Sequence, residues 1–465
     1  MLGGDGIAVD DLVRVARGGA PVELGPAARE RLAAGRAALD AALAGGAAVY
    51  GASRGLGPRA GESTAVGEAG RERAVLLGRS AGVGPSLPAE VVRAALCARL
   101  AGLALGTAGA SPGVAEALAA LLREGRTPPV PSIGSVGVSD LLLLAHAALP
   151  LADDVDLAPK DALSLIGTNA LAVGWAALLV ADATAALALA DEAAALALEG
   201  YGANLSPLDA RVAAARPAPG QEEASARLRA LLAGSRLETP GNSRRLQDPL
   251  SFRCLPSVHG GALAALAAAR ETVGIELRAS GDNPLVLDEG TILPTGNFHA
   301  GALALAVSGL ALALHGVAVA SARRVSHLFD ERSSALPRGL SAAPGTTVGL
   351  AALSKSTAGL VMEIRRLATP AYLDAIDAAE GVEDLAAPAL IAVGDTAAIV
   401  ERLRLLSAIE LLVAAQAVDV RGTVDGLGER TAALHALVRE HVAVLHEDRP
   451  IGPEVDRLAG VLAAR

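Results

Sequence analysis

Long apolar stretches, broken by glycine and proline, dominate the chain. Alanine and leucine are abundant in them, and this favours helices because Ala and Leu lose little on entering one. Strand signals are few and short, for example at 285–294, with a turn expected at Glu289-Gly290. The predicted class is therefore mainly α, with few short strands. Taking Gly and Pro as breaks predicts helices near 26–44, 88–107, 114–124, 139–149, 157–199, 222–235, 257–279, 299–330, 347–367, 396–421 and 429–446.

Several predicted helices are too long for a compact single-layer domain, which favours a bundle of long helices packed lengthwise. Their outer faces are also apolar, so we expect other subunits to cover them. The stretch 299–324 has the length of a membrane span, but its Ala, Gly, Ser308 and His315 make it weakly hydrophobic, so we expect a buried bundle helix. One structural unit is predicted, with an approximate boundary between regions 1–200 and 201–465.

Composition and charge exclude several classes of partner. The 465-residue chain is 52% hydrophobic but only 2% aromatic, and its net charge of −10 is spread without a basic block. We therefore expect a small-molecule ligand and no nucleic acid. Cys97 and Cys254 make no disulfide framework, and the acidic N-terminus does not suit a signal peptide, so a cytoplasmic location without export is expected. The eight histidines form no ligand-spaced cluster, and no metal site is expected.

Eight short motifs follow one another along the chain. They are VYGASRGLG (49–57), LLGRSAGVG (76–84), SIGSVGVSDLLLLAH (132–146), LAPKDALSLIGTN (157–169), QDPLSFRCLPSVHG (247–260), SGDNPL (280–285), TGNFHAGALALA (295–306) and GVEDLAAP (381–388). Together they resemble the aromatic amino acid lyase family, the group of histidine and phenylalanine ammonia-lyases and related aminomutases. The resemblance runs from about Gly6 to the last predicted helix. It implies a long-helix bundle of the ammonia-lyase and fumarase type, and a homotetramer in which three subunits build each active site.

In that family, an Ala-Ser-Gly tripeptide cyclises with loss of water into a methylidene-imidazolone ring, the electrophile that attacks the substrate. The aligned residues here are Val138-Ser139-Asp140, and the register with the family's Leu-Ala-Pro-Leu-Ala-His holds only if the Gly is deleted. Glycine lets the backbone fold back tightly, whereas a β-branched Val stiffens it. We therefore expect no ring and no other cofactor. Ser139 then either takes part in catalysis or merely caps a helix that begins near Asp140.

The resemblance assigns roles to residues that match the family's pattern. Tyr50 matches the tyrosine that removes the substrate β-proton, and Arg54 and Arg79 could supply the positive charge that such a base needs. Glu383 matches the glutamate near the substrate amine, where it can act as an acid or a base. Arg253 matches the arginine that pairs with the substrate carboxylate.

Phe298 matches the residue that packs beside the reactive centre, and Asn297 accompanies it. Structural roles stay open for the matching residues. Tyr50 could be a core tyrosine, Arg253 a salt-bridge partner, Phe298 a packing residue and Glu383 a solvated charge on a helix surface.

Other positions depart from the family's pattern. Arg79 stands in place of the His after Ser, and Leu250 replaces the Tyr of the Gln-Asp-Pro-Tyr-Ser motif, although Gln247 and Asp248 remain. We expect Arg54, Arg79, Gln247 and Leu250 to contact the substrate. The segment LIGTN lacks the Asn of the family's Leu-Ile-Asn-Gly-Thr, for which Asn169 could substitute if the local alignment slips. The missing Gly, Tyr and Asn all serve the ring or its amine adduct, so their joint absence is coherent with chemistry that does not use the ring.

We expect an ammonia-lyase-like enzyme in which Tyr50 and Glu383 transfer protons and Arg253 anchors an acidic group of the substrate. The reaction would be an elimination, a conjugate addition or a ring closure on a specialised biosynthetic intermediate. Fumarases and aspartases eliminate without a prosthetic group, which is an argument from fold analogy. Two alternatives stay open. One is a conventional ammonia-lyase or aminomutase with a ring formed from residues 138–140, and the other is a non-catalytic homologue that binds a metabolite or stabilises a partner subunit.

Overall fold

The computed structural model describes residues 1–287, 290–341, 343, 345–371 and 378–465. The protein is mainly α with few short strands, as the sequence predicted. Two compact units are distinguished, and each combines three segments of the chain. Unit 1 comprises Met1–Ala181, Ala268–Ser308 and Pro370–Gly394, and unit 2 comprises Asp182–Ala267, Gly309–Thr369 and Asp395–Arg465. The predicted boundary near residue 200 stays a prediction.

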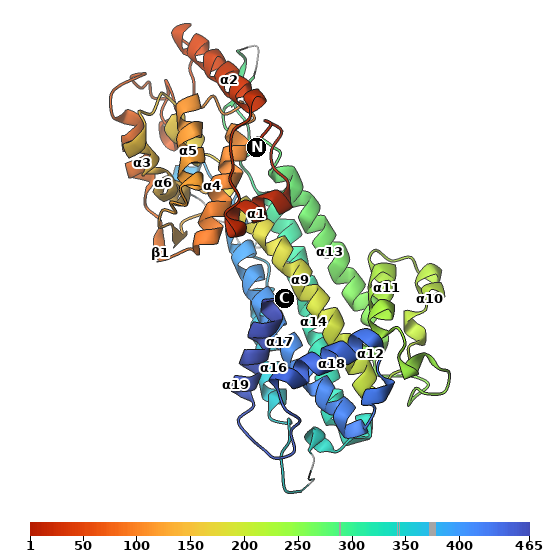
Figure 1. Ribbon diagram of the computed structural model, residues 1–465. Helices are drawn as coiled ribbons and strands as arrows, with labels where there is room; N and C mark the ends of the chain where they lie inside the picture. Colours follow the sequence, from red (N-terminus) through yellow and green to blue (C-terminus); the bar gives the residue numbers. More distant parts are fainter. Residues whose placement is uncertain (288–289, 342, 344, 372–377) are drawn as a thin grey trace. The chain divides into compact units, whose positions relative to one another are not determined.

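Four long helices contribute residues to both units: α9 (Ala170–Tyr201), α13 (Leu255–Glu276), α14 (Gly301–Phe329) and α17 (Ala389–Arg421) (Figure 1). Unit 1 also contains α1 (Val9–Gly18), α2 (Pro26–Ala44), η1 (Gly57–Arg59), α3 (Arg71–Arg79), β1 (Val83–Ser86), α4 (Ala89–Leu103), α5 (Pro112–Arg123), β2 (Pro131–Ile133), α6 (Leu141–Ala148), α7 (Leu151–Asp154), α8 (Asp161–Ile166), β3 (Leu285–Val286), β4 (Ile292–Leu293) and η6 (Ala379–Gly381). Unit 2 also contains η2 (Ser206–Leu208), α10 (Ala210–Ala215), α11 (Gln221–Leu232), η3 (Arg236–Glu238), α12 (Leu250–Arg253), α15 (Glu331–Ser334), η4 (Arg338–Leu340), α16 (Leu353–Leu367), η7 (Val424–Gly426), α18 (Glu429–His441) and α19 (Gly452–Ala463).

Short helices and two strand pairs make up the smaller elements of unit 1. Helix α4 packs against both α1 and α5, while α3, α6 and α8 pack against one another (Figure 1). Strand β3 pairs with β4 in antiparallel fashion, with Leu285 opposite Leu293, where the sequence predicted a hairpin. Glu289 of the predicted turn lies outside the described residues. Strands β1 and β2, which the sequence analysis did not predict, also pair in antiparallel fashion.

The segment 157–199, predicted as one helix, contains the two helices α8 and α9. Gly167 follows the last residue of α8, and the carbonyl of Thr168 accepts a hydrogen bond from the backbone N–H of Asp140 at 2.8 Å. Residues 167–169 therefore form a break that a distant segment of the chain stabilises. Local periodicity could not reveal it, because the partner lies almost thirty residues earlier.

The core of unit 2 includes an aromatic stack and a buried ion pair. The rings of Tyr201 and Phe252 stack with their centroids 4.2 Å apart, and Arg244 lies over Tyr201 at 4.9 Å from its ring centroid. The guanidinium of Arg324 binds both carboxylate oxygens of Glu410, and neither side chain is exposed. Arg324 also donates to a carbonyl of α12, so this pair helps to hold the short helix that carries the predicted site residues Leu250 and Arg253.

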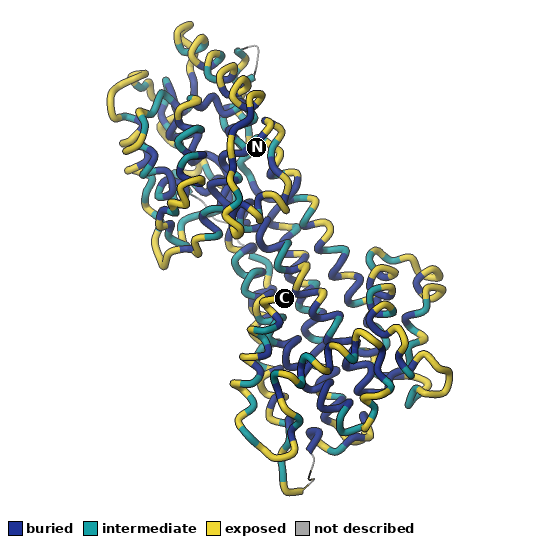
Figure 2. Tube along the Cα trace, viewed as in Figure 1, coloured by how far each residue is buried: buried dark blue, intermediate teal, exposed yellow. Residues whose placement is uncertain are grey.

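Two helical stretches are long and apolar enough to cross a bilayer by length and composition alone, Asp161–Tyr201 and Gly301–Phe329. Core helices of water-soluble proteins meet the same criterion, and the most apolar part of the first stretch is 72% buried. Figure 2 shows the exposed positions in the loops and on the outer sides of helices, with buried positions on the inner sides. Helix α14 leaves Leu305 and Leu312 more than half exposed, which is surface of the kind that subunit contacts cover.

Candidate active site

One cavity of about 400 Å³ in unit 1 brings together five of the residues that the sequence singled out. Its walls come from the loop before η1, the end of α3, the start of α6, the break before α9 and the segment before α14. The surface is mostly apolar, with a few polar groups, as small-molecule sites usually are. The predicted residues that line it are Tyr50, Arg79, Ser139, Phe298 and Glu383.

The motif segment 134–140 forms one wall and is held by backbone contacts on both sides. The carbonyl of Val136 accepts from Ala387 N–H at 3.0 Å, and that of Gly137 accepts from Ala300 N–H at 3.2 Å. Gly137 has a φ of 78°, and a Cβ placed there would lie 1.4 Å from the carbonyl oxygen of Ala387. Only glycine fits this close approach, which fixes the segment between two distant parts of unit 1.

Ser139 adopts the left-handed backbone conformation, with a φ of 77°, which is uncommon for a residue other than glycine. It therefore has the conformation that the missing family glycine favours, a point that the sequence alignment did not reveal. Its backbone N–H donates to the carbonyl of Phe298 at 3.3 Å. The expectation that Ser139 merely caps α6 is wrong, because Asp140 is the residue at the N-cap of that helix.

Asp140 is anchored through both its backbone and its side chain. The N–H donates to Thr168, and the fully buried carboxylate accepts from Ser135 Oγ at 2.6 Å and from Ala172 N–H at 2.9 Å. Ring closure of the family type would require the Asp140 nitrogen to attack the carbonyl carbon of Val138. The N–H on that nitrogen donates to the carbonyl of Thr168 at 2.8 Å.

Burial raises the pKa of Asp140 to about 6, although hydrogen bonds from Ser135 and from the start of α9 partly offset that effect. A folded-state pKa above the unfolded value means that the folded protein binds this proton more tightly. Wild-type stability relative to Asp140→Asn should therefore be highest below pH 4 and fall by about 3 kcal/mol in all as the pH rises through 6. Denaturant unfolding of both proteins from pH 4 to 7 measures this difference, and a difference that does not change with pH would contradict the assignment.

Tyr50 lies on a loop whose shape is set by local hydrogen bonds. Its phenolic oxygen accepts from Gly57 N–H at 2.8 Å and lines the cavity. A donated N–H stabilises negative charge on an oxygen, which suits a group that exchanges a proton with a ligand. Arg54 does not line the cavity; its guanidinium donates to Gly61 O at 3.2 Å and to Ser63 Oγ at 2.9 Å, so it holds the loop.

Two asparagines lie at or beside the cavity lining, which includes Phe298. The amide of Asn169 donates to the carbonyl of Phe298, beside Ser139, so it stands near the motif segment. Asn283 lines the cavity, and its Oδ1 accepts from Thr295 N–H at 2.9 Å. Asn283 belongs to the SGDNPL motif, but the sequence did not predict it as a site residue. Asn297, which was assigned, is exposed outside the lining and donates to Ser280 O at 3.2 Å.

The predicted residues of the QDPLSFRC motif lie in unit 2 and do not line this cavity. Arg253 and Gln247 line a separate hollow of about 400 Å³ together with Arg216 and Cys254. Leu250 is 61% exposed on α12. A single chain thus presents the expected site residues as two groups, and their roles toward a substrate stay predictions.

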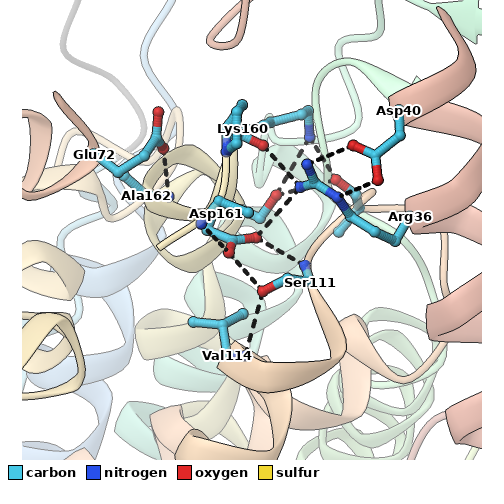
Figure 3. A network of polar contacts seen from close by, with 12 residues as sticks. Arg36, Asp40, Glu72, Ser111, Val114, Lys160, Asp161 and Ala162 are labelled. Carbon is cyan, nitrogen blue, oxygen red and sulfur yellow. Dashed lines mark hydrogen bonds and ion pairs between the residues drawn. The ribbon is translucent and has the colours of Figure 1, made fainter. Parts of the chain in front are cut away.

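A buried polar network supports the wall that Leu163 and Gly167 contribute (Figure 3). Lys160 Nζ donates to Ala108 O at 2.6 Å, and burial lowers the pKa of this amine to about 8. The carboxylate of Asp161 accepts from the N–H and hydroxyl of Ser111 at 2.8 and 2.6 Å. Glu72 accepts from Ala162 N–H at 3.0 Å. These bonds tie the start of α8 to the loop before α5 and to α3.

Within the described ranges, no group of three or more His, Cys, Asp or Glu side chains is arranged to hold a metal ion. Tyr50, Ser139, Asn283 and Glu383 can exchange protons or form hydrogen bonds with a bound molecule, and Arg79 can hold a negative charge.

Comparison with known proteins identifies the class. The family profile described as "Aromatic amino acid lyase" matches residues 7–154 and 152–440. Histidine ammonia-lyase of Anaeromyxobacter dehalogenans is 39% identical over 498 aligned positions, which cover 99% of this chain and 97% of the relative. Histidine ammonia-lyase of Symbiobacterium thermophilum is 35% identical over 97% of this chain and 94% of that protein.

Solved structures agree with this result. An ergothioneine-degrading ergothionase from Treponema denticola, in complex with desmethyl-ergothioneine sulfonic acid, superposes with a TM-score of 0.95 at 29% identity, covering 100% of this chain and 98% of that one. Histidine ammonia-lyase of Trypanosoma cruzi gives a TM-score of 0.90 at 27% identity, with 100% and 93% covered. The fold and site define a helical lyase. The chain belongs to the aromatic amino acid lyase family and is a lyase-type enzyme.

Proposed function

We propose that this enzyme performs acid/base lyase chemistry without a methylidene-imidazolone ring. The observation that carries the proposal is the hydrogen bond of 2.8 Å from Asp140 N–H to Thr168 O, which engages the nitrogen that ring closure would need. The buried side chain of Asp140 reinforces this arrangement. Proton transfer between side chains of the cavity then has to carry the reaction.

In the proposed reaction, the Tyr50 oxygen removes the proton from the substrate carbon next to the one that bears the leaving group. The electron pair of that C–H bond forms the carbon–carbon double bond, and the bond to the leaving amine or hydroxyl breaks. Glu383 gives its proton to the leaving group. Leu141 and Leu142 at the start of α6 line the cavity, so the positive end of that helix faces the negative charge that develops. The reverse sequence is a conjugate addition, and an internal nucleophile would close a ring.

Arg253 supplies the anchor for an acidic group of the substrate in this proposal. Because Arg253 lies in unit 2 and does not line the cavity of unit 1, we propose that it reaches the site of a neighbouring subunit in a homotetramer. The apolar exposed side chains of α14 support subunit contacts. A cytoplasmic location and a specialised biosynthetic substrate belong to the same proposal.

A conventional ammonia-lyase is the second candidate. The 39% identity to a histidine ammonia-lyase over nearly the whole chain favours it. In that case residues 138–140 would cyclise despite the Thr168 contact, and the protein would release ammonia from a free amino acid.

The mass of the intact purified protein distinguishes the two candidates. We expect the mass encoded by the gene and no near-ultraviolet absorbance beyond that of the few aromatic residues. The variant Ser139→Ala, which lacks the hydroxyl that ring formation expels, provides the reference. A wild-type mass that is lower than the encoded mass by two water molecules would overturn the proposal.

A further inference from the structure

Arg79 is the last residue of α3 and lines the cavity while half-buried. Within the described part of the chain, no side chain or carbonyl accepts a hydrogen bond from its guanidinium, and no carboxylate forms an ion pair with it. The other two arginines of α3 differ in this respect. Arg71 pairs with Glu72 at 2.8 Å, and Arg73 pairs with Asp153 at 3.2 Å. The one arginine of α3 that faces the cavity is thus the one without an acidic partner.

Arg79 shares the cavity lining with apolar side chains and with one acidic side chain. Leu56, Val136 and Leu142 also line the cavity and give it an apolar character, and burying a charge beside apolar surface is costly unless the charge is paired. Glu383 lines the same cavity and is not ion-paired with Arg79 in the described residues. Arg79 and Glu383 therefore line one cavity without binding each other in the described residues.

Arginine is the side chain best suited to bind a carboxylate, because its planar fork donates two parallel hydrogen bonds. A neutral ring in this position would leave the guanidinium without an acceptor, at a cost that disfavours such ligands. The Arg79 end of the cavity thus favours a negatively charged group of the ligand, and an amine can lie near Glu383.

We propose that Arg79 binds a carboxylate at the end of the substrate side chain, so that the substrate is an amino acid with a second, distal acidic group. This inference rests on the proposed function in one respect, namely that the cavity is the substrate site. The leaving amine lies near Glu383, and the first acidic group binds Arg253. The substrate class is therefore an amino dicarboxylic acid.

Binding of glutarate and of its monoamide, glutaramate, to the full-length protein tests the proposal by calorimetry. The two probes have nearly the same shape, but glutaramate lacks one charge. We expect the wild type to bind glutarate at least about tenfold more tightly, which is the effect of a charged rather than a neutral hydrogen-bond acceptor. Arg79→Met should abolish this preference, and Arg79→Lys should retain part of it.

Arg73→Met is the matched control, because it removes a paired arginine from the same helix and should leave the preference unchanged. Equal or undetectable binding of the two probes to the wild type, or a preference that survives in Arg79→Met, would overturn the inference. Failure of the inference about Arg79 can be distinguished from failure of the proposed function. A protein that has lost two waters but prefers glutarate would refute the ring-free reaction and leave the role of Arg79 standing.

Discussion

Replacing Tyr50 with phenylalanine should lower kcat by about 10²–10⁴-fold, the usual contribution of a general acid or base. The variant retains the aromatic ring of the side chain and loses only the phenolic oxygen, which accepts from Gly57 N–H at 2.8 Å. The loss of that hydrogen bond should cost about 1 kcal/mol of stability, so the protein stays folded. The rate is measured as the absorbance of the new double bond, with amino acids that carry acidic side chains and with L-histidine as substrates.

Tyr201→Phe provides the matched control for this experiment. Its hydroxyl lies 3.3 Å from Ser333 Oγ in the core of unit 2, and it is buried and does not line the cavity. The control should keep wild-type turnover despite the loss of a tyrosine hydroxyl. If Tyr50→Phe turns over at the wild-type rate, Tyr50 is not the base and the proposed proton transfer is wrong.

The second large effect is expected from the buried ion pair of unit 2. Arg324→Met removes one partner and leaves the Glu410 carboxylate buried without its counter-charge, which typically costs about 3–5 kcal/mol. The substitution also removes the donor to Ser251 O at 3.2 Å, so α12 loses one of its anchors. Chemical denaturation gives the loss in the free energy of unfolding.

The double variant Arg324→Met/Glu410→Met is the appropriate control, because two apolar side chains leave no isolated charge. It should recover most of the lost stability. If the single and double variants are equally destabilised, the loss arises from packing and not from the unpaired carboxylate. Binding of glutarate to the double variant then shows whether the anchoring of α12 also matters for Arg253.

The sequence determined the class of fold because helix formation depends on local composition. Ala- and Leu-rich stretches between glycines and prolines predicted the long helices α9, α13, α14 and α17, and the structure contains all four. Family membership followed from eight motifs in order, each recognisable without coordinates. The absence of the Gly from the Ala-Ser-Gly motif was equally visible in the sequence.

Only the tertiary structure decided how the motif segment is held. Ser139 adopts a left-handed φ of 77°, and Asp140 donates to Thr168 and accepts from the start of α9. These contacts join residues about thirty positions apart, so no local pattern could predict them. The structure also assigned Arg253 to unit 2, and it placed Arg54 in the framework of a loop.

The sequence by itself therefore determined which helices form, because helix formation depends on local residue preferences. It also determined the family, because the motifs can be recognised from residue identity and order alone. The tertiary structure decided which polar groups face the cavity and which are used up in holding it. Arg79 illustrates the difference. The sequence shows only that an arginine follows Gly78, where the family has another residue. That its guanidinium has no acceptor follows from the positions of the side chains in the described part of unit 1.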